Sequence, residues 1–247
     1  MTSQALADFR DGLQLAKELL NIEATYPALP NATQRRPVEA LRGGAVVLMV
    51  GAWESFLRDM VPEHFQSLTQ ATSGTHRSTL PEEIQVTAVW NALELALSGP
   101  LHEASTKKSR LPEVLRVSRV MAADDIEPRA LARMQANPKA QIVAGLFRSV
   151  GIPDIWRAVV PAFTAKWGTA VPDLPQLLDD VVQKRHLAAH SPRLLSVARK
   201  DIQDHVRFLE VLAEVLDDHL AAYCAALQSQ EQATSAAKAA SPVGTGP

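Results

Sequence analysis

Residues 45–60 form the most apolar stretch of the chain, and this stretch limits the folds that are open to it. If it is part of a helix that starts near Pro37, apolar side chains cover almost the whole circumference of that helix. A helix of this kind must contact neighbours on several sides, so it belongs in the middle of a helical bundle. Pro62 is expected to kink or end it, because a proline inside a helix removes a hydrogen bond.

The rest of the chain also favours helix, because it has only 11 glycines and few β-branched runs. No strand is predicted. Helical spacing of apolar residues and the positions of Pro and Gly predict further helices over residues 3–23, about 81–98, 140–150, 153–167, 174–190 and 199–227. Residues 229–247 are almost devoid of large apolar side chains and predict a disordered tail. We therefore expect one all-α domain over residues 1–228, an antiparallel bundle with extra short helices.

Charge and cysteine content exclude several classes of protein. The formal net charge is −2 and the pI is about 6.4, so general attraction to nucleic acid through excess positive charge is excluded. The single cysteine, Cys224, excludes an internal disulfide and fits a reducing, cytoplasmic compartment. The longest apolar run, Ala45 to Trp53, stops at Glu54, far short of the roughly 20 residues that cross a bilayer. No membrane partner is therefore expected.

The segment from Lys184 to His190 carries the residues best suited to chemistry. Pro192 should end the helix near His190, where the helix dipole favours a protonated imidazole. An arginine such as Arg185 binds phosphate in a forked manner, and histidine exchanges protons near neutral pH. Such an Arg–His pair is expected about 0.5 times by chance in a chain of this composition, so a surface arginine and a helix-terminal histidine remain the plain alternative.

Glu54 lies inside the apolar helix and therefore needs a cationic partner. Arg185 is one candidate. The other is Arg58, which lies four residues further along the same helix and would form a helix-surface pair with Glu54.

Several segments, in this order along the chain, resemble the RiboL-PSP-HEPN branch of the HEPN superfamily. The Arg185-His186-x-x-x-His190 segment is similar to the superfamily motif of arginine, a polar residue, three others and histidine. The other similar segments are residues 47–57, 137–147, 151–155, 174–190 and 201–220. The resemblance covers about residues 5–225.

This resemblance implies a HEPN-type bundle that dimerises and brings two arginine–histidine motifs into one cleft. It also implies a metal-independent endoribonuclease without a cofactor, in which the RNA 2′-hydroxyl attacks the adjacent phosphate. By position in the motif, His190 would be the general acid or base, and Arg185 would stabilise the transition state. His186 would be the polar residue, where asparagine is commonest in the superfamily, and Glu54 would orient Arg185.

RNA would also need binding residues, and we expect them at Lys184 and in the basic stretch from Lys107 to Arg119, which we interpret as a loop and a short helix. Within this stretch, Lys107, Lys108 and Arg110 would hold RNA phosphates. The alternative is an ordinary solvated loop. The resemblance further implies a bacterial toxin–antitoxin or antiviral defence setting, with an antitoxin or defence-system partner.

Two other functions remain open at this point. A catalytically silent HEPN domain would bind RNA, a nucleotide or a partner protein without cleaving RNA. Alternatively, Asp179, His186 and His190 lie at spacings that put them on similar helix faces and could hold zinc or iron. The chain offers no second His-x-x-x-His or Glu-x-x-His helix to complete such a centre, so no metal is predicted.

Overall fold

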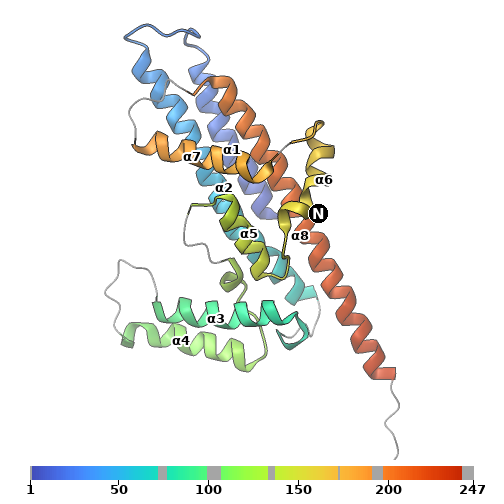
Figure 1. The fold of residues 1–247 in the computed structure, drawn as a ribbon. Coiled ribbons are helices and arrows are strands. Elements are labelled where there is room, and N and C mark those ends of the chain that lie inside the picture. Colours follow the sequence, from blue (N-terminus) through green and yellow to red (C-terminus); the bar gives the residue numbers. More distant parts are fainter. Residues whose placement is uncertain are drawn as a thin grey trace, which may run out of the picture. The chain divides into compact units, whose positions relative to one another are not determined.

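The computed structural model describes residues 2–71, 77–98, 107–132, 137–171, 173–190 and 197–240 (Figure 1). These residues form helices and turns and contain no strand, which confirms the predicted all-α class. The α-helices are α1 (Gln4–Glu23), α2 (Arg35–Ala71), α3 (Glu82–Ser98), α4 (Lys107–Ala122), α5 (Ala140–Ser149), α6 (Ile155–Trp167), α7 (Leu174–His190) and α8 (Arg199–Ala240). Two short 3-10 helices, η1 (Arg77–Thr79) and η2 (Pro128–Ala132), lie between them.

The chain forms two compact units, and each is assembled from separate stretches of sequence. Unit 1 contains residues 1–60, 134–148 and 152–218, and unit 2 contains the remainder. Because the chain passes from unit 1 to unit 2 and back, the units do not correspond to two successive domains. The predicted single domain over residues 1–228 stays a prediction.

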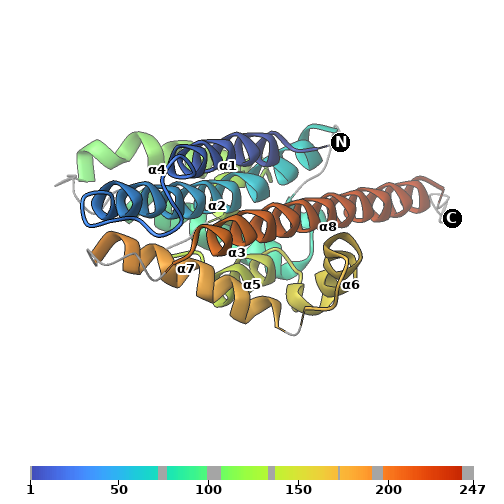
Figure 2. The same cartoon turned by 90° about the horizontal axis from the view of Figure 1, so that it is seen from above.

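Unit 1 is built around the apolar first part of α2. Phe9 of α1 meets Trp53 edge to face, with 6.1 Å between the ring centroids, and lies 5.3 Å from the Phe56 ring. Figures 1 and 2 both show α1 lying beside α2. Ser3 caps α1 by accepting a hydrogen bond from the Leu6 N–H at 3.0 Å, as serine does at helix starts.

A buried ion cluster joins α1, α2 and the start of α8 within unit 1. The Glu23 side chain is completely buried; Arg42 donates a hydrogen bond to it from Nε at 2.9 Å, and Arg42 Nη2 forms an ion pair with the same oxygen at 2.8 Å. Arg199 pairs with the same carboxylate, and Arg42 also donates to the Val197 carbonyl at 3.2 Å. Two cations and shared hydrogen bonds offset the cost of burying this carboxylate.

Helix α2 extends further than one of its two predicted outcomes allows. Pro62 was expected to kink or end it, and because the helix continues through Pro62 to Ala71, an end at Pro62 is wrong, whereas the kink stays a prediction. In unit 2, Phe65 and Leu68 are buried, and that burial helps to offset the proline's cost of about 3 kcal/mol. By length and composition alone residues 35–66 could span a membrane, a test that buried core helices also pass, and half of their most apolar window is buried.

Unit 2 contains the paired helices α3 and α4, which lie side by side in Figure 1 and contact each other. Small residues form their contact, with Ala92 and Ala96 of α3 packed with Val117 of α4 and Ala130 of η2. Asn91 of α3 donates to the Ala130 carbonyl at 2.8 Å. The hydrogen bond fixes η2 against one side of α3.

Two further segments differ from their predictions. Helix α4 already starts at Lys107, so the expected loop there is helix. Helix α8 continues to Ala240, so residues 229–240 are helical where a tail was predicted. The Ala, Gln, Glu and Lys residues of this stretch are good helix formers and need no buried face to continue an existing helix. Residues 241–247 lie outside the described part of the chain.

Candidate functional site

Helix α7 positions Arg185 of the motif, because the apolar side chains in the turns before Arg185 are buried and fix the helix in place. The helix starts with the Asp173 carboxylate accepting the Gln176 N–H at 3.0 Å. Its buried residues are Leu174, Leu178, Val181 and Val182. The next turn carries Arg185, with 33% of its side chain exposed, so its guanidinium is both supported and reachable from solvent.

Arg185 is held by groups from two other segments of unit 1. Its Nη1 donates to Oδ1 of Asn137 at 2.8 Å and lies 3.5 Å from Oε2 of Glu54. Both contacts involve Nη1. The opposite edge of the guanidinium, formed by Nε and Nη2, has the donor geometry that binds two oxygens of one phosphate.

Glu54 forms ion pairs with both arginines that the sequence offered as partners, Arg185 and Arg58. One carboxylate oxygen lies 3.5 Å from Arg185 Nη1, and the other accepts a hydrogen bond from Arg58 Nη2 at 3.1 Å. Its side chain is 30% exposed, so Glu54 lies at the edge of the apolar helix face and is not buried within it. The carboxylate therefore bridges two arginines at the surface of unit 1.

Asn137 is a site residue to which the sequence analysis gave no role. The backbone just after it is fixed on both sides, because Trp53 Nε1 donates to the Pro138 carbonyl at 3.2 Å and Asp179 accepts the Ala140 N–H at 2.7 Å. The amide of Asn137 is thereby positioned for Arg185. The signals in the sequence were the Asn137-Pro138 pair shortly before a helix, which is typical of a turn, and the place of Asn137 at the start of the family-like segment 137–147.

The other motif residues have different surroundings. His186 is exposed. His190 is the last residue of α7, but its side chain lies outside the described part of the structure. Lys184 was predicted to bind substrate, and its Nζ lies 3.1 Å from Nε2 of His205 in α8. Burial and the neighbouring Lys184 charge lower the pKa of His205 to about 4, so His205 is neutral at pH 7 and accepts from the ammonium.

Asp179, a candidate metal ligand in one of the alternatives, caps α5 through the Ala140 N–H. Among the described residues, no three His, Cys, Asp or Glu side chains come together as a metal site. This finding does not cover the side chain of His190, which lies outside the described part of the structure.

The basic residues of the predicted RNA path belong to α4 in unit 2. Lys108 is exposed and Arg110 is half-buried, with its Nε buried and lacking a hydrogen-bond partner. The side chain of Lys107 lies outside the described residues. Their contact with RNA stays a prediction.

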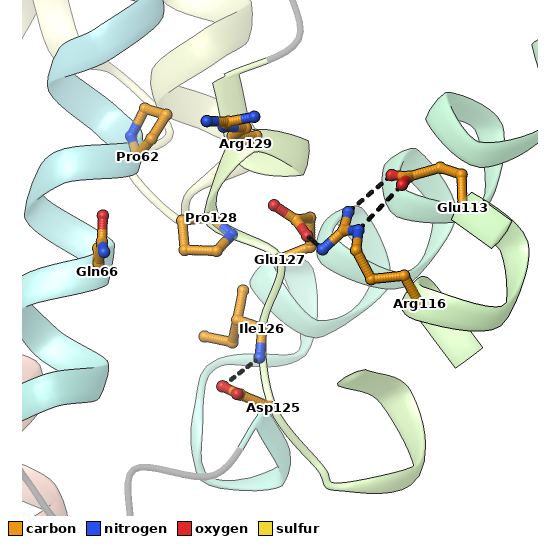
Figure 3. Close-up of a pocket in the computed structure, with 9 residues that line it drawn as sticks. All are labelled: Pro62, Gln66, Glu113, Arg116, Asp125, Ile126, Glu127, Pro128 and Arg129. Carbon is orange, nitrogen blue, oxygen red and sulfur yellow. Dashed lines mark hydrogen bonds and ion pairs between the residues drawn. The ribbon is translucent and has the colours of Figure 1, made fainter. Parts of the chain in front are cut away.

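A pocket of about 690 Å³ lies in unit 2 (Figure 3). The pocket was not predicted, although Arg116 in its wall belongs to the basic stretch that was expected to bind RNA. Figure 3 shows the Arg116 guanidinium between the carboxylates of Glu113 and Glu127. Its hydrogen bonds to Glu113 and Glu127 raise the pKa of Arg116, and Arg116 lowers the pKa of Glu113. Since both carboxylates neutralise the guanidinium, this wall of the pocket is a structural ion-pair network and offers no free charge to an anion.

A comparison with known protein families gives a match that covers most of the chain. The model of the family described as RiboL-PSP-HEPN matches residues 11–222. No curated protein and no solved structure matches the chain. The match includes Glu54, Asn137 and the whole of α7.

Proposed function

Because the chain belongs to the RiboL-PSP-HEPN family, we propose that it is a metal-independent endoribonuclease that uses Arg185 and His190. Membership of the family supports a role in RNA cleavage or nucleotide binding. The finer proposal depends on the residues of this chain.

The observation that carries the proposal is the support of Arg185 by Glu54 and Asn137. Ordering a long arginine side chain costs entropy, and side chains from two distant segments offset that cost at Arg185 while one edge of its guanidinium points away from both contacts. With Nη1 fixed, the Nε and Nη2 edge has a defined direction. Such preorganisation is what stabilises charge that develops on a phosphate.

The proposed reaction is a transesterification within RNA. A base removes the proton of the 2′-hydroxyl, the 2′-oxygen bonds to the adjacent phosphorus, and the bond from phosphorus to the 5′-oxygen breaks. An acid protonates the leaving oxygen, which gives a 2′,3′-cyclic phosphate and a 5′-hydroxyl. His190 serves as acid or base, Arg185 stabilises the doubly charged phosphorane, and His186 shapes the site. No metal or cofactor takes part.

Helix geometry favours a site made from two copies of the chain. Positions 185 and 190 of α7 are five residues apart, which on a regular helix corresponds to a rotation of about 140° and a rise of about 7.5 Å. An arginine from one copy and a histidine from the other can address the same phosphate. This agrees with the homodimer that the resemblance implies.

The first experiment measures cleavage of mixed cellular RNA in the presence of EDTA. We expect the wild type to cleave, and Arg185→Ala and His190→Ala to lose at least about 100-fold in rate. Arg58→Ala is the matched control, because it removes a guanidinium from the same Glu54 carboxylate outside the motif. It should retain most of the activity.

A second experiment mixes the two inactive variants after unfolding and refolding them together. Recovery of activity in the mixture would show that the arginine and the histidine act from different copies. Equal cleavage by the wild type and both alanine variants would refute the proposed site. A wild type that binds RNA without cleaving it would support the silent HEPN domain instead.

A further inference from the structure

Helix α3 exposes a continuous apolar stripe in unit 2. The stripe consists of Val86, Trp90, Leu93 and Leu97, which are 60%, 70%, 37% and 67% exposed. Their spacing of four, three and four residues is the heptad pattern that packs one helix against another. Exposure of a tryptophan to this degree within such a pattern is typical of an interaction surface.

Helix α4 repeats the same pattern. Leu111 and Leu115 are 53% and 46% exposed, and Ser118 and Ala122 continue the stripe with exposed small residues. The spacing is again four, three and four residues. Each position of the α4 stripe therefore corresponds to one of the α3 stripe.

The charges beside the two stripes have opposite signs at corresponding positions. Glu83 precedes the α3 stripe by three residues and Glu94 follows Leu93, whereas Lys108 and Arg119 occupy the equivalent places on α4. Lys108, Arg119 and Glu83 are exposed, and Glu94 is half-buried. Helix α3 thus has an acidic apolar stripe and α4 a basic one.

Both stripes face away from η2. Asn91 of α3 bonds to the Ala130 carbonyl, and Arg116 of α4 bonds to Glu127 just before η2. On each helix these residues lie more than a quarter turn from the middle of the stripe, at 100° per residue. The two stripes can therefore form one face of the α3–α4 pair.

We propose that this face binds a second copy of the same α3–α4 pair, with α3 of each copy against α4 of the other. A two-fold interface requires a surface that complements itself, and an acidic and a basic stripe with one shared heptad pattern meet that requirement. The residues differ from those of the arginine–histidine motif. The proposal therefore holds whether or not the chain cleaves RNA.

The exposed area is sufficient for such a contact. The large apolar side chains of the two stripes expose on the order of 600 Å², which is at the upper end for a patch on a monomer. A standard interface buries about 800 Å² on each partner, including a polar rim. The stripes and their flanking charges together approach that size.

Sedimentation of the full chain over a series of concentrations tests the proposal. We expect the wild type to self-associate, and Trp90→Glu should raise the dissociation constant of the association step made through this face by at least about 30-fold, while the homodimer proposed for the arginine–histidine cleft is unchanged. Leu29→Glu is the matched control, because Leu29 is an apolar side chain of unit 1 that is 91% exposed. Circular dichroism would verify that each variant keeps its helix content.

Charge reversal tests whether α3 of one copy pairs with α4 of the other, because a mere loss of apolar area would not be restored by combining the reversals. Reversing α3 alone (Glu83→Lys with Glu94→Lys) or α4 alone (Lys108→Glu with Arg119→Glu) should weaken the dimer, and combining all four changes should restore it. A monomeric wild type would overturn the proposal. So would a Trp90→Glu variant that associates as strongly as the wild type, or a combined variant that associates no more strongly than either reversal alone.

Discussion

Replacing Arg42 by methionine should strongly destabilise unit 1. The Glu23 carboxylate is completely buried, and Arg42 donates a hydrogen bond to it at 2.9 Å and forms an ion pair with it at 2.8 Å. Removing one partner of a buried ion pair costs about 3–5 kcal/mol, because a charge remains buried without compensation. Arg199 still pairs with Glu23, so we expect a loss near the lower limit, about 3 kcal/mol. For a chain of this size that corresponds to a fall in Tm of about 6–12 °C.

The assay is thermal and urea unfolding followed by circular dichroism at neutral pH. Arg10→Met is the matched control, since Arg10 pairs with Glu214 at 3.4 Å on the surface of the same unit and should cost less than about 1 kcal/mol. Adding Glu23→Met to Arg42→Met should recover part of the lost free energy of unfolding, because it removes the buried carboxylate that Arg42 no longer compensates. If Arg42→Met costs no more than Arg10→Met, the buried cluster does not stabilise the fold as argued.

Three further predictions concern stability. Gly51→Ala in α2 should raise the free energy of unfolding by about 0.5–1 kcal/mol, because the new methyl group meets no atom within 4 Å. Gly12→Ala should lower it in the same denaturation assay, because its methyl group would lie 2.7 Å from the Ala52 Cβ. The pKa of His205 is about 4 in the folded chain and 6.5 for an unperturbed histidine. Between these two pH values the unfolded chain binds a proton that the folded chain does not bind, so the free energy of unfolding should fall as pH falls through this range. His205→Gln should flatten this part of the wild-type Tm–pH curve, and an unchanged slope would contradict the assignment.

Local sequence signals predicted helices with strong apolar spacing well. The expected helix over residues 3–23 is α1 with Ser3 as its cap, and the expected helix over residues 174–190 has the bounds of α7. In both cases the buried face, the cap and the breaker after the helix agree. Agreement between several local signals is what makes a boundary predictable.

Signals that act against each other gave wrong boundaries. Pro62 opposes helix, but burial of Phe65 and Leu68 in unit 2 favours its continuation, and the sequence does not state which effect is larger. After Gln228 the low apolar content indicates disorder while the alanines favour helix, and α8 continues to Ala240. Both outcomes depend on energies that a single sequence does not show.

The candidate site shows where sequence reasoning reaches its limit. Arg185 was found from its spacing and from the resemblance, and Glu54 from the need of a carboxylate in an apolar helix for a cation. Asn137 lies far from both in sequence, so only the fold shows that its amide binds Arg185 at 2.8 Å. The same is true of His205 and Lys184. Since neighbouring helix residues point about 100° apart, the Asn137 contact with Arg185 and the His205 contact with Lys184 restrain the rotation of α7 from two directions. Loss of either contact should therefore change the orientation of Arg185 more than the stability of the fold.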